Sequence, residues 1–336
     1  MPFTSFTRAG FWRQTTQKVL CSALIACLPL TSWADWTPTR AVEYIAPANP
    51  GGGWDTLVRT TANVIRAENL APVNFAPINV PGGGGAIAWA QIARDARNEH
   101  KLFATSPPIL LVPLSGRSRF DHQDFRPIAR LITDYSILLV RADSPYQTVN
   151  DLFEAMASQP QLSVGGGSAA GSMDHIAIAG AAAAAGLDAA RLNYIAFSGG
   201  GEVMTNLRGG HIVAGVTGMG EASAQLQDGA LRALAVSAPE RVPGPLESVP
   251  TYVEQGVDYT FDIWRGVMGP KNMSDQAVAY YQDLFAQMMT TDSWQAARER
   301  LGWYDSYQNS AEFGAFLDEQ AESFRHILSE LGLLAR

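Results

Sequence analysis

Glycine-rich turns recur directly after short apolar runs, and this repeat limits the possible folds more than any other feature of the sequence. Residues 41–46 form an expected strand and lead into a turn with three consecutive glycines, before a helix expected over residues 56–67. Residues 74–80 repeat the pattern, with four glycines in the turn at 82–85. Strands and helices that alternate through short loops predict an α/β fold with parallel strands.

The same unit returns further along the chain. Over residues 101–114 the turn is Thr-Ser-Pro-Pro at 105–108, and glycine loops follow again after the apolar runs at 162–164, 192–196 and 212–216. In open α/β sheets ligands bind beyond the carboxyl ends of the strands, where these loops are expected to lie. Each loop also starts a helix, whose free N–H groups and dipole favour an anion. The sequence therefore predicts an anion-binding cleft lined by several glycine loops.

The length and the breaks in the pattern predict two lobes. A chain of 336 residues is long enough for about two domains. The turn at residues 143–145 and the segment 238–250, which holds four prolines, are expected crossings between the lobes. We predict lobe 1 from residues 36–141 plus 242–336 and lobe 2 from residues 142–241, with two crossing strands as a hinge. Ser274 and Ser310 are expected to cap helices in the C-terminal region.

The first 34 residues differ from the rest. Arg8, Arg13 and Lys18 give a basic start, residues 19–30 are apolar, and small residues follow up to Ala34. This pattern predicts a secretory signal peptide that is cleaved after Ala34. An apolar run of about twelve residues is too short to span the ~30 Å hydrocarbon core of a membrane.

Both cysteines, Cys21 and Cys27, lie in this segment. A chain cleaved after Ala34 keeps neither, which excludes disulfides and thiol chemistry. Residues 24–27 resemble a bacterial lipobox, so a lipid anchor on Cys27 is an alternative.

Cleavage also makes the chain more acidic. It leaves 21 basic and 32 acidic residues, a net charge of −11. Such a charge disfavours nucleic acid and anionic lipid surfaces as partners. No later apolar run reaches the ~18 residues of a membrane span, so we expect a soluble mature protein.

Catalytic signatures fail at specific positions. Gly165 and Gly167 are followed by Ala170 where a dinucleotide fingerprint needs glycine, and Ala170 likewise breaks a nucleophile elbow around Ser168. Residues 121–124, Asp-His-Gln-Asp, could hold a metal ion but are expected to form a solvated loop. We therefore expect a binding protein without catalytic residues, metal or cofactor.

The candidate ligand-binding residues are of two kinds. Loop residues that would offer backbone N–H groups are Gly51, Gly52, Gly53, Trp54, Gly82, Gly83, Gly84, Gly85, Ala86, Phe197, Gly199 and Gly200. Residues that would offer a polar side chain are Asp55, Thr105, Ser106, Ser168, Ser172, His175, Ser198, Thr217 and Arg265.

Some of these roles stay open. Asp55 either only caps its helix or also meets the ligand or its water. His175 is a pocket residue or a helix-start residue that faces solvent. Arg265 is the cation best suited to a carboxylate. Glu202 and Glu221 start helices, where the dipole favours them whether or not they contact a ligand.

With these residues in place, the chain resembles the Bug/TctC family, the extracytoplasmic substrate-binding proteins of tripartite tricarboxylate transporters. The resemblance extends over nearly the whole mature chain. The matching segments are residues 45–55, 81–86, 133–135, 140–145, 194–202, 265–266 and 269–271.

The resemblance implies a periplasmic, two-lobed Venus-flytrap fold of type II, no enzyme activity, a monomer, and docking to a membrane permease of one large and one small subunit. The pattern is similar to the tricarboxylate branch, which implies a citrate-like ligand. In such proteins the first two glycine loops grip a carboxylate through amides and ordered water. That role would fall here on residues 51–55 and 82–86. The Gly/Ser loop that ends in histidine would place Ser168, Ser172 and His175 in the second lobe, although Gly165–Gly167 is richer in glycine than this pattern.

Two other functions remain alternatives. The same fold could present its ligand to a membrane receptor as a sensor. An extracytoplasmic hydrolase is disfavoured, because the sequence lacks a nucleophile–base constellation.

Overall fold

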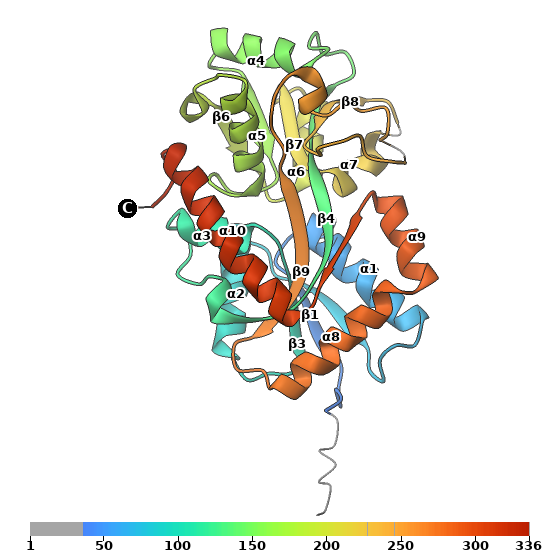
Figure 1. Ribbon diagram of the computed structural model, residues 1–336. Coiled ribbons are helices and arrows are strands. Elements are labelled where there is room, and N and C mark those ends of the chain that lie inside the picture. The colour runs from blue at the N-terminus through green and yellow to red at the C-terminus, as the bar shows by residue number, and fades with distance from the viewer. Residues whose placement is uncertain (1–35, 227, 245, 336) are drawn as a thin grey trace, which may run out of the picture. The chain divides into compact units, whose positions relative to one another are not determined.

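β4 (Phe125–Arg141) is the strand around which the fold is built. The computed structural model describes residues 36–226, 228–244 and 246–335. In Figure 1 β4 lies at the centre, beside β9 (Asp262–Pro270). Residues 125–135 of β4 pair antiparallel with β9, whereas residues 136–141 pair with β7 (Ala214–Gly218) and β8 (Leu231–Val236). β4 therefore connects two groups of strands.

The first strand group contains the parallel strands that follow from the early glycine units. β1 (Val42–Ala46) lies between β2 (Phe75–Asn79) and β3 (Lys101–Thr105), and β3 joins β9 in antiparallel register. β10 (Tyr304–Gln308) pairs with the first half of β4. The helices around this group are α1 (Gly53–Ala67), α2 (Ala86–Arg94), α3 (Pro108–Leu114), α8 (Asp275–Met289), α9 (Asp292–Leu301) and α10 (Ser310–Glu330).

The second strand group repeats the arrangement. β5 (Ser163–Gly166) runs parallel to β6 (Asn193–Ala196) on one side and to β7 on the other. Its helices are α4 (Val149–Ser158), α5 (Met173–Ala184), α6 (Gly200–Arg208) and α7 (Met219–Leu226). The predicted strand–loop–helix units with parallel strands are thus confirmed in both groups, and the glycine loops lie at the carboxyl ends of strands.

β4 is one strand where the sequence pattern suggested two, over residues 128–133 and 136–141. Its apolar side chains are buried along both halves, as expected of a strand covered on both faces. Asp134 looks like a break in the sequence, but its carboxylate is paired with Arg265 of the neighbouring β9. The strand continues through this polar position because residues 133–135 pair with residues 262–264 of β9.

The lobe boundaries stay a prediction. The described residues form one compact unit, and β4 changes partners between Tyr135 and Ser136. The predicted signal peptide and Cys27 lie outside the described residues.

One of the two predicted helix caps is confirmed. The Ser274 hydroxyl accepts a hydrogen bond from the Ala277 N–H at the start of α8. The Ser310 cap is wrong by one residue, since the side chain of Asn309 caps α10. Ser310 instead donates to the carbonyl of Pro127 and ties α10 to β4.

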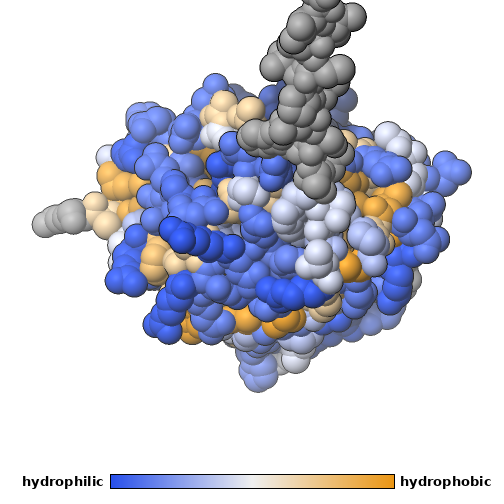
Figure 2. Space-filling view, turned by 90° about the horizontal axis from the view of Figure 1, so that it is seen from below, coloured by the Kyte–Doolittle hydropathy of each residue, from blue (hydrophilic) through white to orange (hydrophobic). Residues whose placement is uncertain are grey.

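The face of the molecule seen from below is mainly hydrophilic. Figure 2 shows separated apolar spots on this face, with polar residues between them. Among the residues that the structure describes, no helix is both long and apolar enough to cross a membrane.

Candidate functional site

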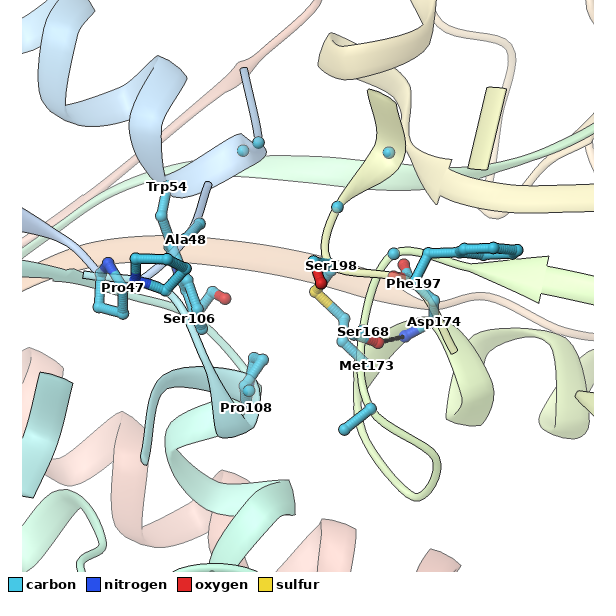
Figure 3. Close-up of a pocket in the computed structure, with 18 of the residues that line it drawn as sticks. Pro47, Ala48, Trp54, Ser106, Pro108, Ser168, Met173, Asp174, Phe197 and Ser198 are labelled. Carbon is cyan, nitrogen blue, oxygen red and sulfur yellow. Dashed lines mark hydrogen bonds between the residues drawn. The ribbon is translucent and has the colours of Figure 1, made fainter. Parts of the chain in front are cut away.

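Loops of the two strand groups face each other across a cleft of about 280 Å³ (Figure 3). This volume is near the lower end of ligand pockets, roughly 300–1,000 Å³, and suits a small molecule. We call the residues from the first strand group the first wall: Pro47, Ala48, Gly52, Gly53, Trp54, Pro81, Gly82, Gly83, Gly84, Ser106, Pro108 and Arg265. The second wall consists of Gly167, Ser168, Ala169, Met173, Asp174, Ala196, Phe197, Ser198, Gly199, Gly200 and Glu221.

The amino terminus of α1 opens onto the first wall. The helix starts at Gly53, and its N-cap, Gly52, provides no side-chain hydrogen bond. The first N–H groups of any helix lack intrahelical acceptors. Gly52, Gly53 and Trp54 line the cleft. The Gly52 N–H bonds to the Asn49 carbonyl at 3.2 Å, so the donors at the cleft surface are the N–H groups of the helix start itself, with the positive end of the helix dipole. This part of the wall is suited to an anion.

The second glycine loop adds backbone to the same wall. Gly82, Gly83, Gly84 and Gly85 all have positive φ, from 62° to 119°. Side-chain residues rarely adopt such angles, so this turn requires glycine. Three of the four line the cleft, whereas Gly85 packs against the ring of Trp89, where a Cβ would lie 2.5 Å away.

Asp55 ties the first loop together and does not line the cleft. One carboxylate oxygen accepts the Gly51 N–H at 2.9 Å, and the other accepts from Arg59 at 2.8 Å and Asn79 at 2.8 Å. Burial alone would raise the pKa of Asp55, but these hydrogen bonds together lower it below its ordinary value. Asp55 therefore holds the loop in shape as an ionised carboxylate.

Arg265 of β9 lies where the two walls meet. It is 2% exposed, and its Nη2 atom is 3.3 Å from Asp134 Oδ2 and 3.8 Å from Glu221 Oε1. Its guanidinium also lies against the start of α1, since a Cβ on Gly53 would be 2.2 Å from Nη1. Burial raises the pKa of Asp134 to about 6, despite the opposing effect of Arg265. The predicted cation is thus already shared between two carboxylates.

Glu221 also occupies donors of the second wall. Its Oε2 atom accepts the Gly200 N–H and the Thr217 hydroxyl, both at 3.0 Å. Glu202 accepts the Ser198 N–H at 3.1 Å. The Gly200 amide, which was expected to face a ligand, and the amide of Ser198 are therefore bonded to protein carboxylates.

His175 shapes a loop instead of lining the cleft. Its Nδ1 atom accepts the Gly171 N–H at 2.8 Å, and its ring stacks on Tyr194 at 4.4 Å between centroids. The Tyr194 hydroxyl in turn donates to the Ser168 carbonyl at 2.7 Å. Burial, with a contribution from Arg117, lowers the pKa of His175 to about 4, so the ring is neutral at physiological pH.

Asp174 is a charged residue of the second wall that was not among the predicted site residues. It lines the cleft beside Ser168 and Met173 (Figure 3) and is only 2% exposed. Its Oδ1 atom has no hydrogen-bond partner among the described residues. Burial and the nearby charge of Glu221 raise the pKa of Asp174 to about 7. A carboxyl group in a first helical turn after a Gly/Ser loop was the available signal.

Steric contacts explain why residues 165–167 are all glycine. A Cβ on Gly165 would lie 2.7 Å from the Phe197 ring, and one on Gly166 would lie 2.2 Å from the Tyr194 hydroxyl. A Cβ on Gly167 would lie 2.6 Å from the backbone of Gly199. The extra glycines thus let neighbouring loops of the second wall pack together.

The structure divides the predicted site residues into two sets. Those that line the cleft are Gly52, Gly53, Trp54, Gly82, Gly83, Gly84, Ser106, Ser168, Phe197, Ser198, Gly199, Gly200 and Arg265. Those outside its lining are Gly51, Asp55, Gly85, Ala86, Thr105, Ser172, His175 and Thr217. Among the described residues, the hydroxyls of Thr105, Ser106 and Ser172 are buried without hydrogen-bond partners.

The candidate metal loop at 121–124 has internal partners. Asp121 and Asp124 form a capping box on a 3₁₀ turn, and His122 Nε2 is 2.9 Å from Asp318 Oδ1. Over the described ranges, no cluster of three potential metal ligands occurs.

Comparison with known proteins identifies the family. Residues 62–333 match TctC, the tripartite tricarboxylate transporter family receptor. This chain belongs to the TctC family. It is 26% identical to Protein BugT of Bordetella pertussis (strain Tohama I) over 250 residues, which cover 73% of this chain and 75% of BugT.

Solved TctC-like structures share the fold. A TctC solute-binding protein from Polaromonas, solved without ligand, is 30% identical with a TM-score of 0.63 and covers 87% of this chain and 99% of its own. MatC from Rhodopseudomonas palustris with bound malate is 20% identical, with a TM-score of 0.76 and 87% and 99% coverage. An R. palustris protein with adipate is 22% identical, with a TM-score of 0.80 and 89% and 99% coverage.

The predicted family and the α/β periplasmic-binding-protein fold are therefore confirmed. TctC proteins are periplasmic solute-binding proteins and not a family of enzymes. The ligand of this family member has to be inferred from the geometry of its cleft.

Proposed function

We propose that this TctC-family protein captures a small carboxylate, with a citrate-like tricarboxylate as the first candidate, and delivers it to the membrane permease of a tripartite tricarboxylate transporter. The observation that carries the proposal is the uncapped start of α1 on the first wall, with the Arg265 guanidinium against Gly53. A carboxylate placed there would accept charge-assisted hydrogen bonds from N–H groups that have no intrahelical acceptor.

The first wall suits one carboxylate. The loops at Gly52–Trp54 and Gly82–Gly84 supply backbone, and the buried Ser106 hydroxyl, which lacks a partner among the described residues, supplies a further donor or acceptor. Backbone groups recognise the carboxylate itself and not the remainder of the molecule. The malate and adipate in two similar structures support the carboxylate class.

We propose that the signal peptide over residues 1–34 directs the chain to the periplasm, with a lipid anchor on Cys27 as the alternative.

We also propose that the predicted lobes close on the ligand about β4 and β9, which pair side by side.

Thermal unfolding with citrate, malate and adipate tests the ligand class. A ligand that binds only the folded state stabilises it by about 2.7 kcal/mol at a concentration of 100 times Kd. We expect at least one of these carboxylates to raise Tm in a concentration-dependent manner, whereas the trimethyl ester of citrate should not. If none of the three carboxylates raises Tm, the proposed ligand class is refuted.

Delivery is tested separately by uptake of the bound carboxylate in cells that lack the protein. Loss of uptake, restored by the wild-type gene, is the expected result. Tight binding without any effect on uptake would favour a sensor that presents its ligand to a receptor.

A further inference from the structure

The cleft holds more negative than positive charge. Asp134, Asp174 and Glu221 are gathered around Arg265, which lies 3.3 Å from Asp134 and 3.8 Å from Glu221. Asp174 and Glu221 line the cleft itself. A ligand with two or more carboxylates would therefore add negative charge to a site whose single guanidinium is already shared between protein carboxylates.

Glu221 and Asp174 differ in how their carboxylates are satisfied. Glu221 accepts hydrogen bonds from the Gly200 N–H and the Thr217 hydroxyl. Asp174 is more deeply buried and keeps an oxygen without a partner in the described part of the chain. An unpaired buried carboxylate is costly, so Asp174 is the group whose protonation state a ligand can change most readily.

The groups around Asp174 come from several elements. Glu221 of α7 disfavours its charged form, while Arg265 of β9, Ser168 and the Gly167 backbone favour it. Tyr194 of β6 is neutral, because burial and the charge of Asp174 raise its pKa well above the ordinary value. His175, the next residue of α5, is neutral at physiological pH because burial lowers its pKa.

We infer that Asp174 is a specificity-determining residue that takes up one proton when the cleft binds its carboxylate ligand. This inference rests on the proposed function. The proton comes from solvent, and the resulting carboxyl O–H donates a hydrogen bond to a ligand carboxylate that reaches the second wall. One negative charge is removed as another enters, so the wall can accept an anion without an additional cation.

Proton uptake is measurable by calorimetry on the full mature protein. Citrate, malate and adipate are titrated at pH 8 in phosphate and in Tris, whose ionisation enthalpies differ. The difference in observed binding enthalpy between the two buffers, divided by the difference in their ionisation enthalpies, gives the number of protons taken up per ligand. We expect about one proton for wild type, since Asp174 with a pKa of about 7 is mostly ionised in the free protein at that pH.

The variant Asp174→Asn, with Asp143→Asn as the control, locates the proton. Asn mimics the protonated acid, so Asp174→Asn should bind with no proton uptake. Its affinity should be constant from pH 7 to 8.5, where the ligand carboxylates are themselves largely ionised, whereas wild-type affinity falls about 16-fold as the protonated fraction of Asp174 decreases. Asp143→Asn removes an exposed, ion-paired carboxylate outside the cleft lining and should keep an uptake of about one proton.

Two outcomes would overturn the inference. Binding of a carboxylate to wild type at pH 8 without proton uptake would directly contradict the proposed protonation of Asp174. Loss of all binding in a folded Asp174→Asn variant would mean that the ligand needs an ionised Asp174, as an ammonium group on the ligand would. The proposed function fails differently, since then none of the three carboxylates binds wild type.

Discussion

The two walls of the cleft are built from the same local unit but differ in their electrostatics. On the first wall, the start of α1 has no side-chain cap, and its carboxylate, Asp55, faces the supporting loop. On the second wall, Glu202 and Glu221 bond to the loop amides, and Asp174 lines the cleft. A glycine loop at a strand end therefore does not by itself define an anion site.

The placement of acidic side chains decides what each loop can bind. Amides without a partner attract an anion, whereas amides already bonded to a carboxylate offer little to one. Arg265 lies where the two walls meet and contacts both. The largest expected effect therefore comes from removing this residue.

Arg265→Met should lower the free energy of unfolding by about 3–5 kcal/mol, because it leaves Asp134 and Glu221 buried without their cation. Chemical denaturation at pH 8 measures this. The loss should be smaller at pH 5, where Asp134, whose pKa is about 6, can protonate. Adding Asp134→Asn should restore part of the stability. A single variant as stable as wild type would show that Arg265 does not hold the walls together.

Asp174→Asn should change how stability depends on pH. The folded-state pKa of about 7 lies above the ordinary value of 3.8, so folding favours the protonated form. Wild type therefore loses stability as pH rises from about 4 to 7, and the variant is spared this loss. Near pH 4 the two should be equally stable, while at pH 8 the variant should be more stable, by up to ~4 kcal/mol. Parallel Tm curves for the two proteins would contradict this.

Asp55→Ala tests the supporting role of the acid behind the first wall. The change removes the acceptor for Gly51, Arg59 and Asn79, and should cost about 2 kcal/mol of stability. Asp143→Ala is the control, because Asp143 forms an exposed ion pair and should show no measurable change. Affinity for carboxylates should fall together with the order of the loop. Unchanged stability with lost affinity would instead place Asp55 at the ligand.

Gly53→Ala compares the helix starts of the two walls. A Cβ at Gly53 would lie 2.2 Å from the Arg265 guanidinium, while a Cβ at Gly201 in α6 meets nothing within 4 Å. We expect Gly53→Ala to weaken carboxylate binding about tenfold, equivalent to ~1.4 kcal/mol. Gly201→Ala should keep wild-type affinity and gain roughly 0.5–1 kcal/mol of stability. Titration calorimetry measures the carboxylate affinity of both variants. If Gly53→Ala and Gly201→Ala bind with equal affinity, Gly53 and Arg265 do not belong to the anion site.

Much of the fold could be predicted from local sequence. Apolar runs followed by glycine turns marked β1, β2, β5 and β6, and the later helices followed from their own periodicity and capping residues. β9 carries no comparable local mark, although it supplies Arg265. The continuity of β4 was also missed, since residues 133–135 pair with residues 262–264 of β9, which lie far along the chain.

Local sequence was enough to predict that glycine loops gather at strand ends, since turns and helix starts depend on neighbouring residues. It also marked Arg265 as a candidate cation. Which loop amides are bonded to protein acids, and which acids enter the cleft, depends on how distant segments pack in the folded chain. Glu221 reaches Gly200 and Arg265 through folding alone, and burial beside Glu221 raises the pKa of Asp174. Charges act through space, so their effect depends on distances that the order of residues does not contain.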